Sequence, residues 1–185
     1  MLQPRMIRVT NVVHLLSLAL WAGGSLFFSY LTTPRIFAYL RDQLPADPPP
    51  GLQGLTDEMG RRLAGNTVGA IFPTYFVSQI IAGVLAVASG FVLAKAGQRL
   101  EKIRWGLAIA ALAIVSLHAA TVYPRSVRVL DAHYAAQAAR DEPKAVSLRK
   151  TFGMWHGISQ ILNLLTICLV VAAVALAGIA LRDPA

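Results

Sequence analysis

The sequence predicts an all-α fold: an integral membrane bundle of four antiparallel transmembrane helices with short extramembrane helices. The chain of 185 residues is 56% hydrophobic and only 14% charged, a composition typical of membrane proteins. Residues 9–34, 63–94, 105–124 and 151–181 contain no charged residue, and each run reaches the ~20 apolar residues that cross a bilayer as a helix. We therefore expect one membrane domain, 1–185, with spans at about 9–33, 66–94, 105–123 and 152–180.

The charge distribution and the absence of known motifs exclude several classes of function. The net charge of +8 does not indicate nucleic acid, because the basic residues flank the apolar runs, where Lys and Arg set topology or meet anionic lipid headgroups. Membrane lipid is the expected partner, and a homo-oligomer or a membrane-complex partner stays open. Cys168 is the only cysteine, which excludes an intrachain disulfide. Nucleotide-binding and metalloprotease motifs are absent from the sequence, so we assign neither catalytic residues nor an enzymatic reaction.

The first span follows a short basic arm, Met1 to Arg8, and is too long for the apolar core of a signal peptide. At ~100° per residue, its polar residues share one face with a tryptophan. They are Asn11, His14, Ser17, Trp21, Ser25, Ser29 and Thr32. Ala22-Gly23-Gly24 offers close approach to a neighbouring helix. Pro34-Arg35 marks the predicted membrane exit, with the helix continuing from Ile36 to Leu44.

The connection that follows predicts a turn or polyproline piece at 45–51. An amphipathic helix is expected next, lying on the membrane surface or on the bundle. Its apolar positions are Leu52, Leu55, Met59 and Leu63. In the second span, Pro73 removes a backbone donor and predicts a kink. The span carries Thr67, Thr74, Ser78 and Tyr75 on one side and a small-residue ridge of Ala82, Ala86 and Gly90.

The third span follows a short basic connection (95–104) and is Ala-rich until His118 and Thr121. Pro124-Arg125 is expected to close it, with a helical extension over 126–139 in which His133 is a solvated residue. Asp141-Glu142-Pro143 predicts a turn with proline at the start of the last helix.

The fourth span carries a polar stripe within an arc of ~120°. Its members are His156, Ser159, Gln160, Asn163 and Thr166. Such a stripe inside a span must face protein or water rather than lipid.

Counting residues from the ends of the spans places two histidines at a similar depth in the membrane. His118 lies six residues before Pro124, or ~9 Å below the membrane surface, and His156 lies ~6 Å in from Phe152 on the same side. We therefore predict a ligand-binding site formed by six side chains. They are His156, His118, Ser159, Gln160, Asn163 and Tyr75. His14 lies ~20 Å away along the membrane normal and cannot ligate the same ion.

Four spans place both termini on one side of the membrane. Arg5, Arg8 and the short basic connection favour termini in the cytoplasm, although the two longer loops hold ten Lys and Arg residues. The expected location is a bacterial inner (plasma) membrane.

Several motifs together resemble the transmembrane protein 205-like family, a domain of unknown function (number 4149). They are Val13-His14-Leu15-Leu16, Trp21-Ala22-Gly23, Thr33-Pro34-Arg35-Ile36-Phe37, Ile71-Phe72-Pro73-Thr74-Tyr75-Phe76, Tyr123-Pro124-Arg125, Leu148-Arg149-Lys150-Thr151-Phe152, His156-Gly157-Ile158-Ser159 and Asn163-Leu164. The resemblance implies a four-span membrane protein and no agreed activity. Its eukaryotic member is associated with platinum-drug resistance, which implies metal or drug handling.

The first span alone is similar to the opening of J-type bacterial protoporphyrinogen oxidases and copper-resistance D proteins. In the former the first-span histidine is taken to bind haem, which implies cofactor binding at His14.

Two classes of function follow. One is a membrane protein that binds a small ligand, haem b or a transition metal at a polar intramembrane site, with His118 and His156 as metal candidates and a role in redox chemistry or metal and drug tolerance. The other is a non-catalytic structural or accessory subunit whose histidines are neutral and hydrogen-bonded between helices. A closed four-ligand zinc site is not expected, because the spans hold no acidic residue and no second cysteine.

Overall fold

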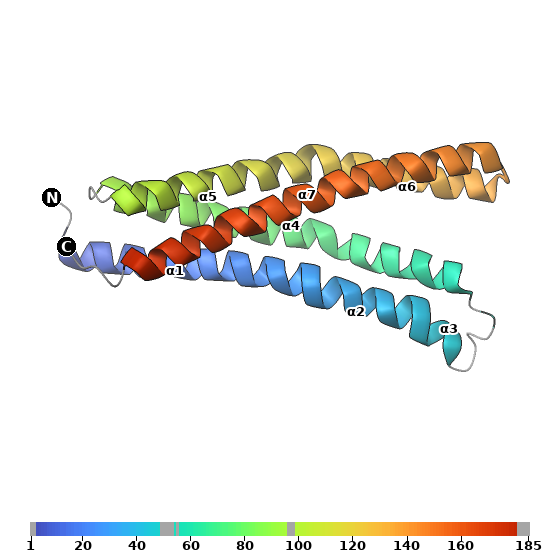
Figure 1. The fold of residues 1–185 in the computed structure, drawn as a ribbon, viewed down its shortest axis with the longest axis horizontal. Helices are drawn as coiled ribbons and strands as arrows, with labels where there is room; N and C mark the ends of the chain where they lie inside the picture. Colours follow the sequence, from blue (N-terminus) through green and yellow to red (C-terminus); the bar gives the residue numbers. More distant parts are fainter. Residues whose placement is uncertain (1–2, 49–53, 55, 96–98, 181–185) are drawn as a thin grey trace.

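A computed structural model describes residues 3–48, 54, 56–95 and 99–180. Four helices in it are long and apolar enough to cross a membrane: Arg5–Gln43, Asp57–Lys95, Arg99–Ala138 and Glu142–Gly178. They form a long bundle (Figure 1), which confirms the predicted all-α membrane fold. The predicted spans 9–33, 66–94 and 105–123 lie inside the first three of these helices, and 152–180 overlaps the fourth.

The first helix consists of α1 (Pro4–Leu26), the π-helical segment η1 (Phe27–Thr32), α2 (Thr33–Phe37), the π-helical segment η2 (Ala38–Gln43) and α3 (Leu44–Ala46). The second is α4 (Asp57–Lys95). The third consists of α5 (Arg99–Leu117), the π-helical segment η3 (His118–Val122) and α6 (Tyr123–Ala138), and the fourth is α7 (Glu142–Ala180).

These helices are longer than a bilayer requires. A helix of 39 residues, such as α4, extends ~58 Å, whereas the hydrocarbon core is ~30 Å thick. The predicted extramembrane helices are therefore continuations of the spans. Residues 57–63, expected in a separate amphipathic helix, are the first turns of α4, and Leu52 and Leu55 lie outside the described residues.

Proline explains the three π-helical segments. Each segment is capped by a backbone N–H that donates to the carbonyl five residues earlier, as Thr33 does to Phe28 and Tyr123 to His118. The residue after each cap is a proline: Pro34, Pro45 and Pro124. Because proline has no N–H and its ring clashes with the carbonyl four residues before it, a one-residue bulge lets the helix continue. The helices therefore continue past Pro34 and Pro124, as the sequence predicted for 36–44 and 126–139, and the bulges that allow this were not predicted.

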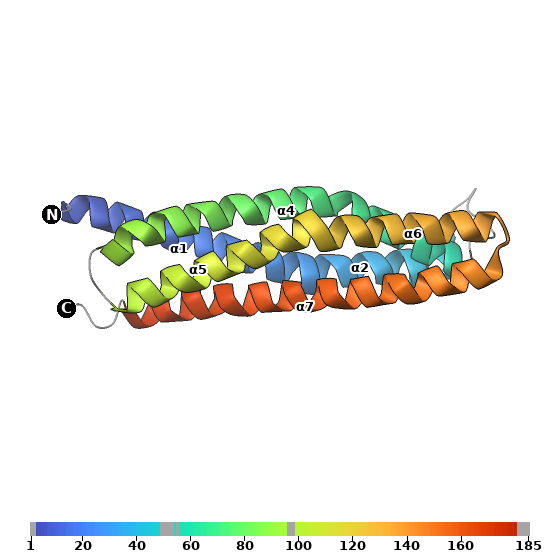
Figure 2. The ribbon, with the colours of Figure 1, turned by 90° about the horizontal axis from the view of Figure 1, so that it is seen from above.

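The beginning of α1 and the end of α7 lie at one end of the bundle, opposite the α6–α7 turn (Figure 1). We call the end with this turn the loop end. α5 packs against both α4 and α7, which lie on opposite sides of it (Figure 2), and α1 packs against α4 and α7. At the loop end α2 and η2 pack on α4, whereas α6 packs on α7. In the described part of the chain, no contact of comparable extent joins α2 or η2 to α6 or α7.

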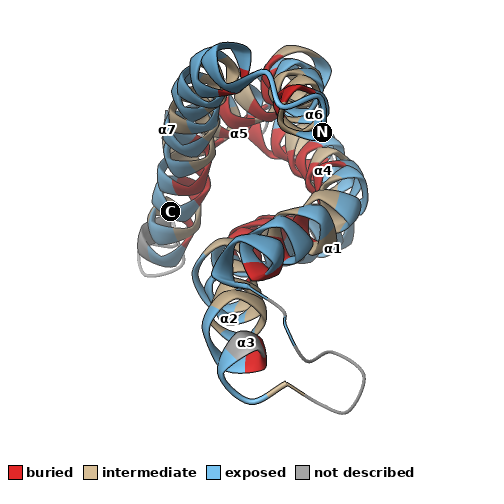
Figure 3. Ribbon diagram, turned by 90° about the vertical axis from the view of Figure 1, so that its right-hand side faces the viewer, coloured by how far each residue is buried: buried red, intermediate tan, exposed pale blue. Residues whose placement is uncertain are grey.

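Burial follows the pattern of a membrane bundle. Buried residues face the interior and exposed ones the outside (Figure 3). Large apolar side chains remain exposed on the outer faces, including Leu20 (71%), Phe27 (62%) and Ile161 (61%), as expected for surfaces that meet lipid. Small residues allow close approach: a Cβ at Gly83 would come within 2.8 Å of the Trp21 ring and 2.9 Å of Leu112.

Several side chains differ from the sequence interpretation. Thr74 and Ser78 are exposed rather than interior, and the Ser78 hydroxyl donates to the Tyr75 carbonyl, a local bond that lets a polar side chain face lipid. Gly23 and Gly24 are exposed, with no side-chain neighbour. His133 is buried on α6, not solvated, and its Nδ1–H donates to the Ala145 carbonyl on α7.

Candidate functional site

A cavity of about 190 Å³ lies between the four long helices, and we call it the intramembrane cavity. The six side chains predicted to bind ligand all line it. Their neighbours around the cavity include Phe28, Ser29, Thr33, Phe37, Val68, Phe72, Tyr123, Leu130 and Phe152. The cavity is therefore apolar over most of its wall, with a small number of convergent polar groups, as is common for small-molecule sites.

Two of the π-helical segments form part of the wall. η1 contributes Phe28 and Ser29, and η3 begins at His118. A π-bulge changes which side chains of a helix face the bundle, and such bulges are frequent at functional sites. The proline after each cap thus explains how two distant segments present these residues to one cavity.

A hydrogen bond joins the third helix to the fourth at the wall. The distance from His118 Nε2 to Ser159 Oγ is 2.7 Å. The His118 ring is buried and lies edge-on to Phe76, with ring centroids 4.8 Å apart. His118 and His156 therefore line the same cavity, and Ser159, three residues after His156 on α7, bonds to His118.

A second polar connection crosses three helices. The Tyr75 hydroxyl donates to Asn163 Oδ1 at 2.9 Å, and Asn163 Nδ2 donates to Ser29 Oγ at 2.9 Å. The Tyr75 ring also stacks on Phe28, with centroids 4.3 Å apart. Asn163 is thus an interior hydrogen-bonding residue that holds η1, α4 and α7 together.

His156 and Gln160 are arranged differently. Their only side-chain hydrogen bond found among the described residues is to each other, with 3.0 Å between Gln160 Nε2 and His156 Nε2. Because the amide nitrogen must donate, His156 Nε2 accepts and the proton of the neutral ring lies on Nδ1. Both residues are exposed, and Phe152 stacks on the His156 ring at 5.6 Å. The Nδ1–H and the Gln160 carbonyl oxygen therefore remain available to a ligand.

His14 does not line this cavity. It is fully buried nearer the termini, and its Nδ1–H donates to the Ala86 carbonyl at 2.9 Å. A Cβ at Gly90 would lie 3.0 Å from the His14 ring. Haem on His14 Nε2, which is also buried, would require α1 and α4 to separate.

The structure also buries charge that the sequence interpretation placed in a loop. Arg104 is 1% exposed and its Nη1 pairs with Glu101 Oε1, both in the first two turns of α5, which begins at Arg99. The spacing of Glu101 and Arg104, one helical turn apart, is the one signal in the sequence from which this ion pair could have been predicted.

The fit of a metal or haem to the intramembrane cavity is limited. Among the described residues, no three His, Cys, Asp or Glu side chains group as a metal site, so His118 and His156 would supply two imidazoles and need further ligands from hydroxyl or amide groups. The volume of about 190 Å³ is below the ~300–1,000 Å³ of pockets for drug-sized ligands, and haem does not fit without movement of the helices.

Comparison with protein families supplies one match. Residues 16–135 match the family described as "Domain of unknown function (DUF4149)". The chain belongs to this family. The DUF4149 match includes Tyr75 and His118 and ends before α7, so it covers the cavity wall formed by the first three helices and not His156. Searches for similar curated proteins and for similar solved structures gave no match.

Proposed function

We propose that the protein binds a small, mostly apolar molecule carrying a hydrogen-bonding group in the intramembrane cavity. The observation that supports this most is the His156–Gln160 pair, which faces the cavity without a bond to another helix. Polar groups left unsatisfied in a membrane cost free energy, so an Nδ1–H and an amide oxygen at a cavity wall favour a polar partner there. The aromatic side chains around them favour an apolar body for that ligand.

In a second version of this proposal, the bound species is a transition metal. His118 and His156 would hold it as neutral imidazoles, because imidazole is the commonest protein ligand for such metals. Ser159 would orient the His118 ring through the hydrogen bond that it already makes. Nδ1 of His156 could bind a metal only with the ring proton on Nε2, where the Gln160 amide oxygen would accept it after the amide turns. Metal analysis of the purified protein tests this form separately from binding of an organic ligand.

The alternative is a structural or accessory subunit without a ligand. The Tyr75–Asn163–Ser29 connection favours it, because these groups satisfy one another across three helices. Hydrogen bonds of this kind between membrane helices stabilise the fold by ~0.6 kcal/mol each on average. The alternative gives no role to the exposed His156–Gln160 pair.

Photolabelling distinguishes the two. The probe is a neutral aryl-diazirine alcohol, added to the protein in lipid nanodiscs, with adducts located by mass spectrometry. Gly69 lines the cavity and a Cβ there meets nothing within 4 Å, so Gly69→Leu places a side chain in the cavity with no contact at its first carbon. We expect labelling of cavity residues to fall roughly tenfold in this variant, the effect of ~1.4 kcal/mol.

Gly23→Leu is the matched control, because Gly23 is exposed on α1 and also has open space at its Cβ. It should leave labelling of the cavity unchanged. Equal labelling of the wild-type protein and Gly69→Leu, or adducts confined to lipid-facing residues, would support the subunit without a ligand.

A further inference from the structure

A second cavity, of about 360 Å³, lies between α4, α6 and α7 towards the loop end. We call it the arginine vestibule. Its charged lining residues are Glu58, Arg61, Arg62 and Arg149. The vestibule thus holds three cations and one anion. Apart from Phe152, its lining residues lie outside the predicted spans, where we expect lipid headgroups and water to meet the protein.

The vestibule arginines have no carboxylate partner in the described part of the chain, where ion pairs join only Arg41 to Asp42 and Arg104 to Glu101. Glu58 accepts a hydrogen bond from Gln137 on α6 instead. The Arg62 guanidinium of α4 lies 4.4 Å from the ring centroid of Tyr134 on α6. This cation–π contact holds the guanidinium against the α6 side of the vestibule. Burial raises the pKa of Tyr134 while the Arg62 charge opposes the rise, so the phenol stays neutral at pH 7 and can donate a hydrogen bond.

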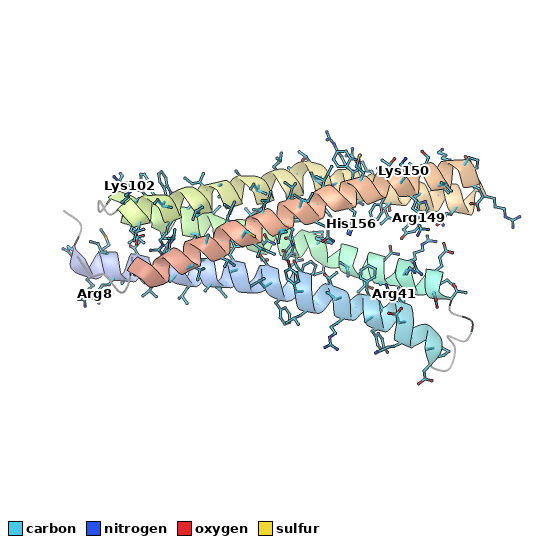
Figure 4. All side chains as sticks on the ribbon, in the orientation of Figure 1. Arg8, Arg41, Lys102, Arg149, Lys150 and His156 are labelled. Carbon is cyan, nitrogen blue, oxygen red and sulfur yellow. The ribbon has the colours of Figure 1, made fainter. Side chains whose placement is uncertain are left out.

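The vestibule and the intramembrane cavity share part of their lining. Leu130 and Phe152 belong to both. Arg149 precedes His156 by seven residues on α7, a rise of ~10 Å, and it lies nearer the loop end than His156 (Figure 4). A cationic compartment at the interface therefore adjoins an apolar compartment inside the membrane.

We propose that the ligand is an anionic amphiphile, whose carboxylate or phosphate is bound by Arg62 and Arg149 while its chain enters the intramembrane cavity past Leu130 and Phe152. This rests on the proposed function. Guanidinium groups match both oxyanions through paired hydrogen bonds, and uncompensated arginines attract them. The lack of extensive contact between α2 and α7 at the loop end leaves a side on which the chain can reach the cavity from lipid.

The test uses three diazirine probes with the same alkyl chain: a fatty acid, an alkyl phosphate and an alcohol. In nanodiscs of neutral lipid, we expect at least one anionic probe to label cavity residues about tenfold more than the alcohol, the ratio that ~1.4 kcal/mol of charge-assisted binding gives. The double variant Arg62→Gln/Arg149→Gln should remove this preference. The two anionic probes distinguish carboxylate from phosphate recognition.

Lys150→Gln is the matched control, because Lys150 follows Arg149 on α7, is exposed and lines neither compartment. It should keep the preference. High salt should weaken the preference in the wild-type protein without any substitution, which tests the inference even if the double variant folds poorly. Equal labelling by the alcohol, or a preference that survives both high salt and loss of the two arginines, would overturn it.

The two proposals fail in different ways. If the small aryl alcohol labels the intramembrane cavity and the long-chain anions do not, the cavity binds a ligand and this inference is wrong. If neither kind of probe labels the cavity, the proposed function fails as well.

Discussion

The His118 imidazole and the Ser159 hydroxyl, 41 residues apart in the chain, form a 2.7 Å hydrogen bond at the wall of the intramembrane cavity. One belongs to a π-helical segment of the third helix and the other to the fourth helix. The bond fixes the orientation of the His118 ring and therefore the shape of the cavity at that point.

A double-mutant cycle measures this bond. We expect His118→Phe and Ser159→Ala to show a coupling free energy of ~0.5–1.5 kcal/mol, the usual contribution of such a bond. The measurement is reversible unfolding in mixed micelles for the wild type, each single variant and the double variant. A coupling indistinguishable from zero would mean that the two side chains do not interact.

Asn163→Leu should lower the free energy of unfolding by about 1–3 kcal/mol, because it leaves the Tyr75 and Ser29 hydroxyls without their partner inside the bundle. Thr74→Val is the control, since Thr74 is exposed and should tolerate an apolar side chain. The melting temperature in detergent measures both. A more stable Asn163→Leu protein would show that this carboxamide does not hold the helices together.

Gly83→Val should be destabilising by ~1–3 kcal/mol through overpacking, because any Cβ at this position meets Trp21 and Leu112. The matched substitution Gly23→Val adds the same side chain to an open position and should have a small effect. Thermal unfolding of both proteins provides the comparison. Similar melting temperatures would contradict the close approach of α1, α4 and α5.

Labelling of single cysteines checks the topology. In a Cys168→Ala background, Lys95→Cys at the end of α4 and Asp141→Cys before α7 lie at opposite ends of the bundle and should react with an impermeant maleimide from opposite sides of the membrane. The side on which Lys95→Cys reacts also decides whether the termini are cytoplasmic. Labelling of both from one side would contradict a four-span bundle.

The sequence predicted the fold because membrane spans are set by the length and apolarity of a run, both of which are local properties. It also brought Tyr75, His118 and His156 to one cavity, since depth in the membrane follows from residue counts along a helix. The sequence could not indicate which faces meet: Ser78 satisfies its hydroxyl within its own helix and faces outward, while Ser29 lines the cavity.

The π-helical segments were the main feature missed. The sequence predicted that the helices continue past Pro34 and Pro124, but not that each does so through a π-helical bulge directly before the proline. The vestibule was missed for another reason. Arg62 and Arg149 lie 87 positions apart, and only the packing of α4, α6 and α7 brings them to one compartment.

Native mass spectrometry of the protein extracted from its membrane tests ligand binding in the cavity most directly. We expect the wild type and Gly23→Leu to retain the same bound small molecule or metal, and Gly69→Leu to lose it. Retention by all three proteins would place the bound species outside the intramembrane cavity. A wild-type protein that binds nothing, even after incubation with the aryl alcohol and the three long-chain probes, would contradict the proposed function.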